Sequence, residues 1–285
     1  MTSVNHVAQA LPQARWEARI RLRYASLEGR TTLVEREHRG PLYVQKPFYP
    51  EGPAICHTIL IHPPGGIAGG DALTCELALG EGSHVLATTP GAAKWYRSAG
   101  RPASQALHFE LAAGAVLEWL PQETIIFNAA QARLTTRIAL AEGAAFLGWE
   151  ILCLGRTASA EKFIRGRLEL DTRVDIAGKP HWIERGCIEA DDGLLQSPIG
   201  WSGQSVFATL FAAGRIATPE SVELCREVEA GAGARSGVTA MGPLLVARYL
   251  GNSSQRAKAY CVAVWQRLRP WLAAREAVLP RIWST

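Results

Sequence analysis

Apolar and polar residues alternate with a period of two along much of the chain, which is the pattern of half-buried β-strands. Near the N-terminus, the segment RIRLRY places Ile20, Leu22 and Tyr24 on one face and three arginines on the other. The segments RGRLELDTRVDI and HWIERGCIEA are expected to form a hairpin around a turn at residues 177–179. The pattern predicts a mainly β protein.

Three segments repeat one arrangement, in which a short alternating strand, a turn with a glycine and a second apolar strand follow one another. They are ELALGEGSHVLATTP from Glu76, FELAAGAVLEWLPQ from Phe109 and RIALAEGAAFLGWEI from Arg137. A unit that recurs every 30 residues or so, mostly without a helix, indicates stacked β-coils around turns at Gly82, Gly114 and Gly143. Three ordinary hairpins in a β-sandwich fit the same pattern.

Helices are expected to be few. Thr89-Pro90 supplies an N-cap and a first-turn proline for a short helix through GAAKWYRS, and Thr218-Pro219 does the same for a second helix. A third helix is expected to begin near Ser253 or Ser254, and Pro270 should kink or split it. Its apolar stripe consists of Ala257, Cys261, Val264, Trp265, Leu268 and Leu272.

Composition limits the class of protein. At 285 residues, with 48% hydrophobic and 20% charged residues, the chain is expected to fold as a soluble protein of one large or two ordinary domains. Its apolar runs are shorter than the roughly 20 residues that span a bilayer, and residues 1–14 are expected to form a flexible leader without a secretory signal. Six cysteines without a CxxC pair favour reduced thiols in the cytoplasm.

The stretch HPPGGIAGGDAL, residues 62–73, resembles a nucleotide-binding loop only in its spacing of glycines. A phosphate-binding loop needs Lys and then Ser or Thr after its last glycine, but Asp71 and Ala72 follow Gly70 here. A carboxylate at the position of the cation would repel phosphate. Nucleotide binding by this loop is therefore excluded.

Catalytic and metal motifs are scarce. The chain has no G-x-S-x-G, no H-E-x-x-H and no paired cysteine ligands. Cys56 and His57 are neighbours on an expected strand, so they point to opposite faces and cannot hold one ion together. Glu150 and Glu184 stand inside apolar strands and require a salt bridge, hydration or protonation. They are either ordinary ion-pair partners or the lining of a wet internal passage with Asp71 at its mouth.

Several stretches resemble the UreD family, also called UreH, of urease accessory proteins. They are HPPGGIAGGD, TTPGAAKWYRS, LEWLPQETIIF, LCLGR and the terminal LPRIWST. The resemblance runs from about Trp16 to Thr285. It implies one domain over residues 15–285, with a right-handed β-helix-like body of stacked strands over about 15–215. A part containing the C-terminal α-helices is implied over about 216–285.

The resemblance also implies a function without catalysis and without a tightly bound cofactor. UreD proteins bind the urease apoprotein and recruit UreF, which docks UreG, and this assembly inserts nickel into urease. GTP is used by the partner UreG, which agrees with the failed phosphate loop here. The chain is accordingly expected to be a cytoplasmic scaffold with transient nickel and with no nucleic-acid or membrane partner.

In the family, an internal tunnel is proposed to carry nickel toward urease. The resemblance assigns this tunnel to a set of residues that comprises four candidate nickel ligands and two further lining residues. These are Cys56, Asp71, Glu150 and Glu184 as ligands, with Ala93 and Lys94 as lining. Position 93 is Ala where a relative has Ser, and position 150 is Glu where a relative has Asp. Gly65, Gly66, Gly69 and Gly70 are expected to form a structural loop that turns sharply at the tunnel wall or at a partner face and presents Asp71.

The residues alone do not exclude two other classes of function. A small-molecule hydrolase could use the embedded acids as general acid and base, which requires two carboxylates converging in one pocket. A β-solenoid module could bind nucleic acid or polysaccharide, which requires an exposed basic or aromatic stripe.

Overall fold

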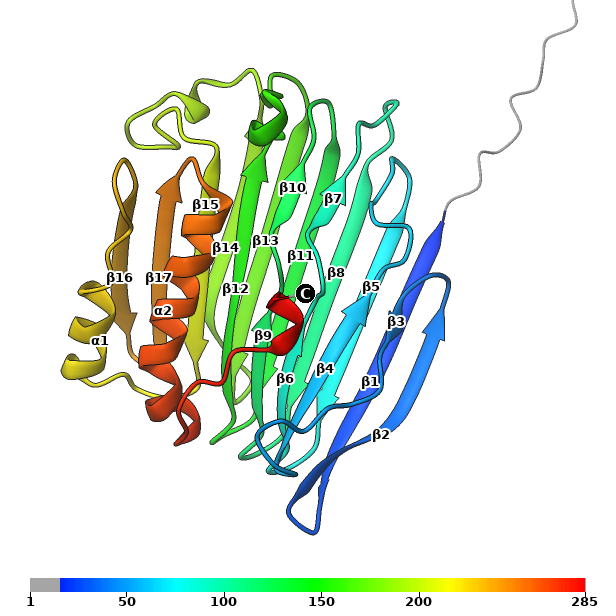
Figure 1. Ribbon diagram of the computed structural model, residues 1–285, viewed down its shortest axis with the longest axis vertical. Coiled ribbons are helices and arrows are strands. Elements are labelled where there is room, and N and C mark those ends of the chain that lie inside the picture. The colour runs from blue at the N-terminus through cyan, green and yellow to red at the C-terminus, as the bar shows by residue number, and fades with distance from the viewer. Residues whose placement is uncertain (1–15, 285) are drawn as a thin grey trace, which may run out of the picture.

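The computed structural model describes residues 16–284, so the expected leader over residues 1–14 lies outside the described part. Within this range, two β-sheets lie face to face, and helix α2 covers the outer face of the larger sheet (Figure 1). One hydrophobic cluster fills the space between the sheets, and a second fills the space between the larger sheet and the helices. The prediction of a mainly β, solenoid-like protein with few helices is confirmed.

The smaller sheet has seven strands in the order β14-β13-β11-β8-β5-β1-β2. All its inner pairings are parallel, and only the two outermost pairs are antiparallel. The strands are β1 Glu17–Leu27, β2 Arg30–Arg39, β5 Ala72–Leu79, β8 Ala103–Leu111, β11 Gln131–Leu140, β13 Arg167–Ile176 and β14 Lys179–Glu189.

The larger sheet has ten strands, eight of them in the order β16-β17-β15-β12-β9-β6-β4-β3, while β10 pairs with β12 and β7. Strands β4, β6, β9 and β12 are parallel. The strands are β3 Tyr43–Val44, β4 Ile55–Ile61, β6 His84–Thr88, β7 Ala93–Trp95, β9 Val116–Leu120, β10 Thr124–Ile126, β12 Ala145–Leu154, β15 Val206–Ala213, β16 Arg235–Met241 and β17 Leu244–Gly251.

The repeated segments are coils of a solenoid and not hairpins. In each repeat, the first strand belongs to the seven-stranded sheet and the second to the ten-stranded sheet, as with β5 and β6. The turns between them stack on one another, and the amide of Gly82 donates to the carbonyl of Ala113 in the next turn, 3.1 Å away. Gly82, Gly114 and Gly143 all have positive φ, which explains why glycine recurs there.

The outer face of the seven-stranded sheet carries alternating charges. On β1, Ile20, Leu22 and Tyr24 are buried as predicted, while the arginines between them point outward. These arginines form ion pairs with neighbouring acids, as between Arg21 and Glu76 at 2.8 Å. Positive charge on this face is therefore balanced locally.

Two of the three expected helices are confirmed. Helix α1 spans Pro219–Arg226 with Thr218 as its N-cap, and α2 spans Ser254–Ala273 with Ser253 as its N-cap. The whole predicted apolar stripe of α2 is buried. Pro270 does not split α2, which continues past it to Ala273.

The prediction of a helix after Thr89-Pro90 is wrong. Residues 93–95 form strand β7, whose backbone pairs with β10, and Trp95 is buried. Thr89 does not cap a helix, because its hydroxyl accepts a hydrogen bond from the amide of Gln122 at 2.9 Å. Pairing with a strand some 30 residues distant overrides the local helix signal.

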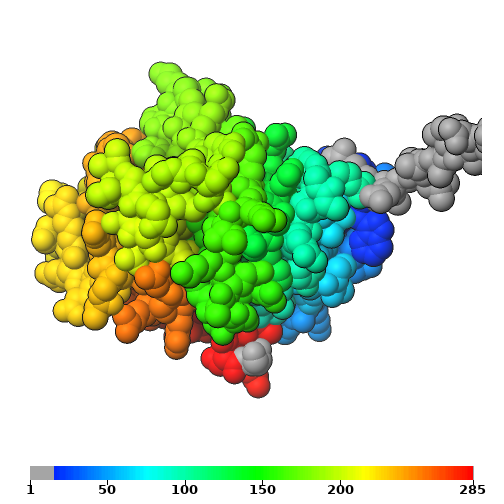
Figure 2. Space-filling model, turned by 90° about the horizontal axis from the view of Figure 1, so that it is seen from above, coloured from blue at the N-terminus to red at the C-terminus, as the bar shows by residue number. Residues whose placement is uncertain are grey.

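The connections at the two ends of the sheets differ. One end has the tight glycine turns, and the other has longer segments, which include the glycine-rich loop between β4 and β5. At this second end, the loops between β12 and β13 and between β14 and β15 cover the sheets (Figure 2). They contain the 3₁₀ helices Thr157–Ser159 and Gly193–Leu195, and a third 3₁₀ helix spans Arg281–Ser284. In residues 16–284, no helix combines the length and the apolar character needed to cross a bilayer.

Candidate functional site

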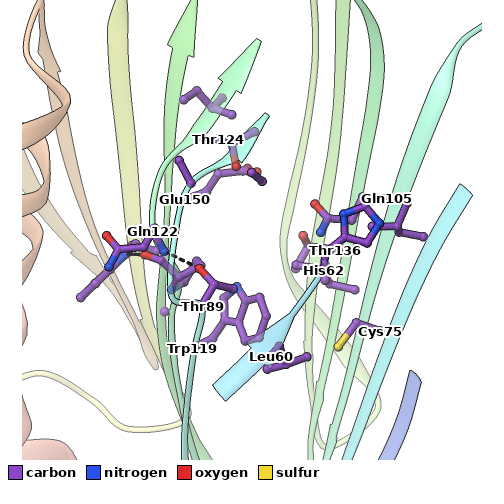
Figure 3. Close-up of a pocket in the computed structure, with 18 of the residues that line it drawn as sticks. Leu60, His62, Cys75, Thr89, Gln105, Trp119, Gln122, Thr124, Thr136 and Glu150 are labelled. Carbon is purple, nitrogen blue, oxygen red and sulfur yellow. Dashed lines mark hydrogen bonds between the residues drawn. The ribbon is translucent and has the colours of Figure 1, made fainter. Parts of the chain in front are cut away.

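A cavity of about 400 Å³ lies between the two sheets. Its lining is mainly apolar, but amide, hydroxyl, imidazole and carboxylate groups also face it. Figure 3 shows Glu150, Gln122 and Thr89 on one side of the hollow, and His62, Gln105 and Thr136 on the other. Interior polar groups of this kind require partners or water. The cavity is therefore the candidate site.

The wall on the seven-stranded sheet includes one row of register partners. The row crosses β5, β8, β11, β13 and β14 and consists of Cys75, Leu107, Thr136, Thr172 and Glu184. All five residues line the cavity. Since neighbours in register share one face of a sheet, the period-2 pattern of each strand aligns these side chains toward the interior.

A second row crosses the ten-stranded sheet and consists of Glu150 on β12, Thr209 on β15 and Arg248 on β17. Glu150 and Thr209 line the cavity. On β12, nine of the ten residues are buried and only Glu150 is half-buried, because its carboxylate faces the hollow. The two rows meet at one edge, where Arg248 donates to Glu184.

Glu150 has an unusual electrostatic position. Among residues 16–284, no group forms a hydrogen bond or an ion pair with its carboxylate. Burial, together with the negative charge of Glu184, raises the pKa of Glu150 to about 7. The passage-lining alternative therefore fits Glu150 better than the salt-bridge alternative.

Glu184 differs from Glu150, because it has a cationic partner. Nη2 of Arg248 lies 2.6 Å from Oε1 of Glu184, and both side chains are partly exposed. Glu184 thus combines the two alternatives, since it lines the cavity and also forms a salt bridge.

The glycine-rich loop adjoins the cavity at the end with the longer connections. Gly65 and Gly66 line it, and Gly65 adopts a φ of +70°. A Cβ on Gly66 would lie 2.1 Å from the ring of Tyr96, so only glycine fits there without a shift. The second doublet behaves in the same way, with a φ of +100° at Gly70 and no room for a Cβ at Gly69.

Asp71 closes this loop and does not line the cavity. Its Oδ2 accepts a hydrogen bond from the amide of Ala68 at 2.8 Å, which is a local turn contact. Its charge acts on His62, which does line the cavity. Burial lowers the pKa of His62, and Asp71 opposes this effect. A role for Asp71 as a nickel ligand stays a prediction.

The remaining predicted residues divide into two groups. Ala93 and Lys94 on β7 line the cavity. Cys56 does not, because it is buried beside Thr58, whose Oγ1 lies 3.8 Å from its sulfur. Burial raises the pKa of the Cys56 thiol, which disfavours the thiolate that binds metals. The adjacent His57 points to the opposite face, where it contacts Glu51.

A buried ionic network lies on the other side of the ten-stranded sheet, under α2. Arg269 of α2 is fully buried and bonds both Glu51 and Glu118. Each of these acids also accepts a hydrogen bond from a histidine, His57 for Glu51 and His84 for Glu118. Burial alone would raise the pKa of Glu51, but the hydrogen bonds from His57 and Arg269 lower it to about 2. The network therefore joins α2 to β4, β9 and the β3–β4 connection.

Sequence reasoning missed this network and most of the polar lining. Gln105 gave a signal for the lining, because it occupies an inward position of an alternating strand whose other inward residues are apolar. The network gave no comparable signal, since Arg269 on the helix pairs with an acid 218 residues away.

Comparison with known proteins assigns the chain to a family. The sequence profile described as UreD urease accessory protein matches residues 17–284. The chain belongs to the UreD family of urease accessory proteins. A protein from Dechloromonas aromatica named urease accessory protein UreD is 48% identical over 288 residues, which covers both chains completely. Its namesake from Methylobacillus flagellatus is 47% identical over 285 residues, again with complete coverage of both.

The possible metal donors of this UreD-family chain are dispersed. Within the described residues, no group of three or more His, Cys, Asp and Glu side chains could hold a metal ion. Single oxygen and nitrogen donors are instead spread along the cavity wall.

Proposed function

We propose that the protein is a non-enzymatic scaffold in urease maturation. It binds the urease apoprotein, recruits UreF and through it the GTPase UreG, and passes nickel toward urease through the cavity between its sheets. One observation carries the nickel part of the proposal, namely the unpaired carboxylate of Glu150 facing an interior cavity. Membership in a family of urease accessory proteins supports the remainder.

The physical argument for nickel starts from its charge. A divalent cation in a low-dielectric interior needs compensating negative charge nearby. Glu150 has no cationic partner that would compete with the metal, and its pKa of about 7 lets it exchange a proton for the cation near neutral pH. Glu150 and the neutral Thr and Gln side chains of the wall offer single contacts, which are weak enough for release.

The two alternative functions receive less support. The cavity does bring Glu150 and Glu184 to one hollow, as a hydrolase would require, but Glu184 is engaged by Arg248, and the related proteins are named as accessory proteins. A nucleic-acid module needs unbalanced positive charge, whereas most arginines of the seven-stranded sheet pair with acids. Such pairs include Arg133 with Glu169 and Arg173 with Asp175.

Glu150→Gln tests the proposal, because it removes the charge with little change of shape. We expect this variant to co-purify with UreF and urease as the parent does, while urease activity and nickel per urease active site fall together. Glu110→Gln on β8 is the matched control, since Glu110 is exposed. Asp71 is a poorer choice, because it closes a turn.

Unchanged nickel content in Glu150→Gln would overturn the nickel path. Activity that falls only in proportion to lost complex would instead assign Glu150 to assembly and remove the argument for transport.

A further inference from the structure

Arg248 occupies a position where an apolar residue is expected. Every second side chain of β17 points inward. The other inward residues beside Arg248 are Leu244, Val246 and Leu250, which belong to the core between the sheets or pack against it. An arginine in this row requires compensation, since an unpaired charge in the interior is strongly unfavourable.

The compensation comes from the opposite sheet. Glu184 on β14 accepts the 2.6 Å hydrogen bond from Arg248. The guanidinium also lies 6.0 Å from the ring centroid of Trp182 and 5.6 Å from that of Phe207, within the range of cation–π attraction. Arg248 itself does not line the cavity, but its ion pair with Glu184 joins the ends of the two rows, next to two aromatic rings.

This ion pair stands where the interior meets the surface. Glu184 and Phe207 line the cavity, and β14 is the edge strand of its sheet. The side chains of Arg248 and Glu184 are 40% and 32% exposed, so water already reaches the pair and can solvate each partner when they separate. An apolar pair at this position would also close the edge, but water would not stabilise its two members when they separate.

We propose that Arg248 is a gate residue, which closes the β14–β17 edge of the cavity while paired with Glu184 and controls by its charge which ions pass. Paired, the two groups block the edge, and their opposite charges sum to zero. Separated from Glu184, the guanidinium would repel cations, so passage of a cation requires Arg248 to swing outward and leave Glu184 free. The assignment of nickel as the passing ion rests on the proposed function, but the gate itself does not.

Thiol labelling tests the gate directly. Thr209→Cys places a reporter in the cavity beside Arg248 in the register of β15 and β17, and native Cys75 is a second cavity thiol on β5. Cys187→Ser removes the exposed native thiol from the full-length background. The probes are 2-aminoethyl methanethiosulfonate, which is cationic, and 2-sulfonatoethyl methanethiosulfonate, which is anionic.

Arg248→Gln should speed labelling of Thr209→Cys by about tenfold, which corresponds to about 1.4 kcal/mol. Labelling of Cys75 should change far less, because burial raises the pKa of its thiol well above the usual range and the thiolate that reacts is scarce while the fold is intact. In Arg248→Gln the cationic probe should gain more than the anionic one, because Glu184 is left without its partner. Glu184→Gln should reverse this preference. Arg235→Gln is the matched control, since Arg235 is exposed on the adjacent strand β16, and it should leave both rates unchanged.

Equal rates in the parent and Arg248→Gln would overturn the gate, because the probes would then reach Thr209→Cys by another opening. A parallel rise at Thr209→Cys and Cys75, with a lower melting temperature, would also overturn it and make Arg248 a packing residue. Nickel per urease active site in the same variants and in Glu150→Gln decides the nickel path separately, so the two proposals can fail independently.

Discussion

Replacing Glu150 with Gln should stabilise the protein at alkaline pH, although it removes a charged side chain from the interior. In the folded state, burial and the charge of Glu184 raise the pKa of Glu150 to about 7, so at higher pH the chain must hold an unpaired carboxylate in an unfavourable position. Gln has nearly the same shape and carries no charge. The substitution therefore removes an electrostatic penalty while preserving packing.

The size and the sign of the effect follow from the pKa. A rise from 4.5 to about 7 corresponds to roughly 3 kcal/mol at most. The pKa of Glu150 is higher in the folded state than in the unfolded state, so protonation of this residue favours folding. Its contribution to the free energy of unfolding is complete below pH 4.5 and is lost as the pH rises through about 7. Glu150→Gln and the parent should therefore differ little in acid and differ most above neutral pH. Water in the cavity reduces the penalty, so we expect roughly 1 to 3 kcal/mol.

The assay is urea unfolding of the parent, Glu150→Gln and the exposed control Glu110→Gln, each at pH 5 and pH 8. The free energy of unfolding of Glu150→Gln should exceed that of the parent at pH 8 and approach it at pH 5, while Glu110→Gln should follow the parent at both. A Glu150→Gln variant that is less stable than the parent at pH 8 would refute the reasoning, because it would mean that the carboxylate holds a stabilising partner.

Two further predictions concern residues outside the polar rows. Arg269→Met should lower the free energy of unfolding by roughly 3 to 5 kcal/mol, because it leaves the buried acids Glu51 and Glu118 without their shared cation; a loss below about 1 kcal/mol by urea unfolding would show that the two histidines suffice. Gly66→Ala should destabilise by roughly 1 to 3 kcal/mol, because its Cβ would collide with Tyr96. Gly91→Ala, where a Cβ meets open space, is its control, and equal melting temperatures for these two variants would contradict the steric argument.

Local sequence patterns were enough to locate many of the secondary-structure elements. Alternation identified the buried face of β1 through Ile20, Leu22 and Tyr24, and the apolar stripe with a serine cap identified α2. Recurring glycines marked the turns between coils. These signals are local, because side-chain periodicity, capping and positive φ depend on residues within a few positions of one another. The motifs that resemble UreD were equally readable, and the family assignment agrees with them.

Contacts between residues that are distant in the sequence became known only from the tertiary structure. The alternation of apolar and polar residues could not distinguish coils from hairpins. A strand has the same pattern whether the next strand joins the same sheet or the opposite one. The segment after Thr89 became a strand because β10 was available to pair with it. Likewise, both Glu150 and Glu184 read as acids in apolar strands, yet one is unpaired and the other bonds Arg248, 64 positions along the chain. Coulombic and hydrogen-bond energies depend on distance in space, and the order of residues along the chain does not encode that distance.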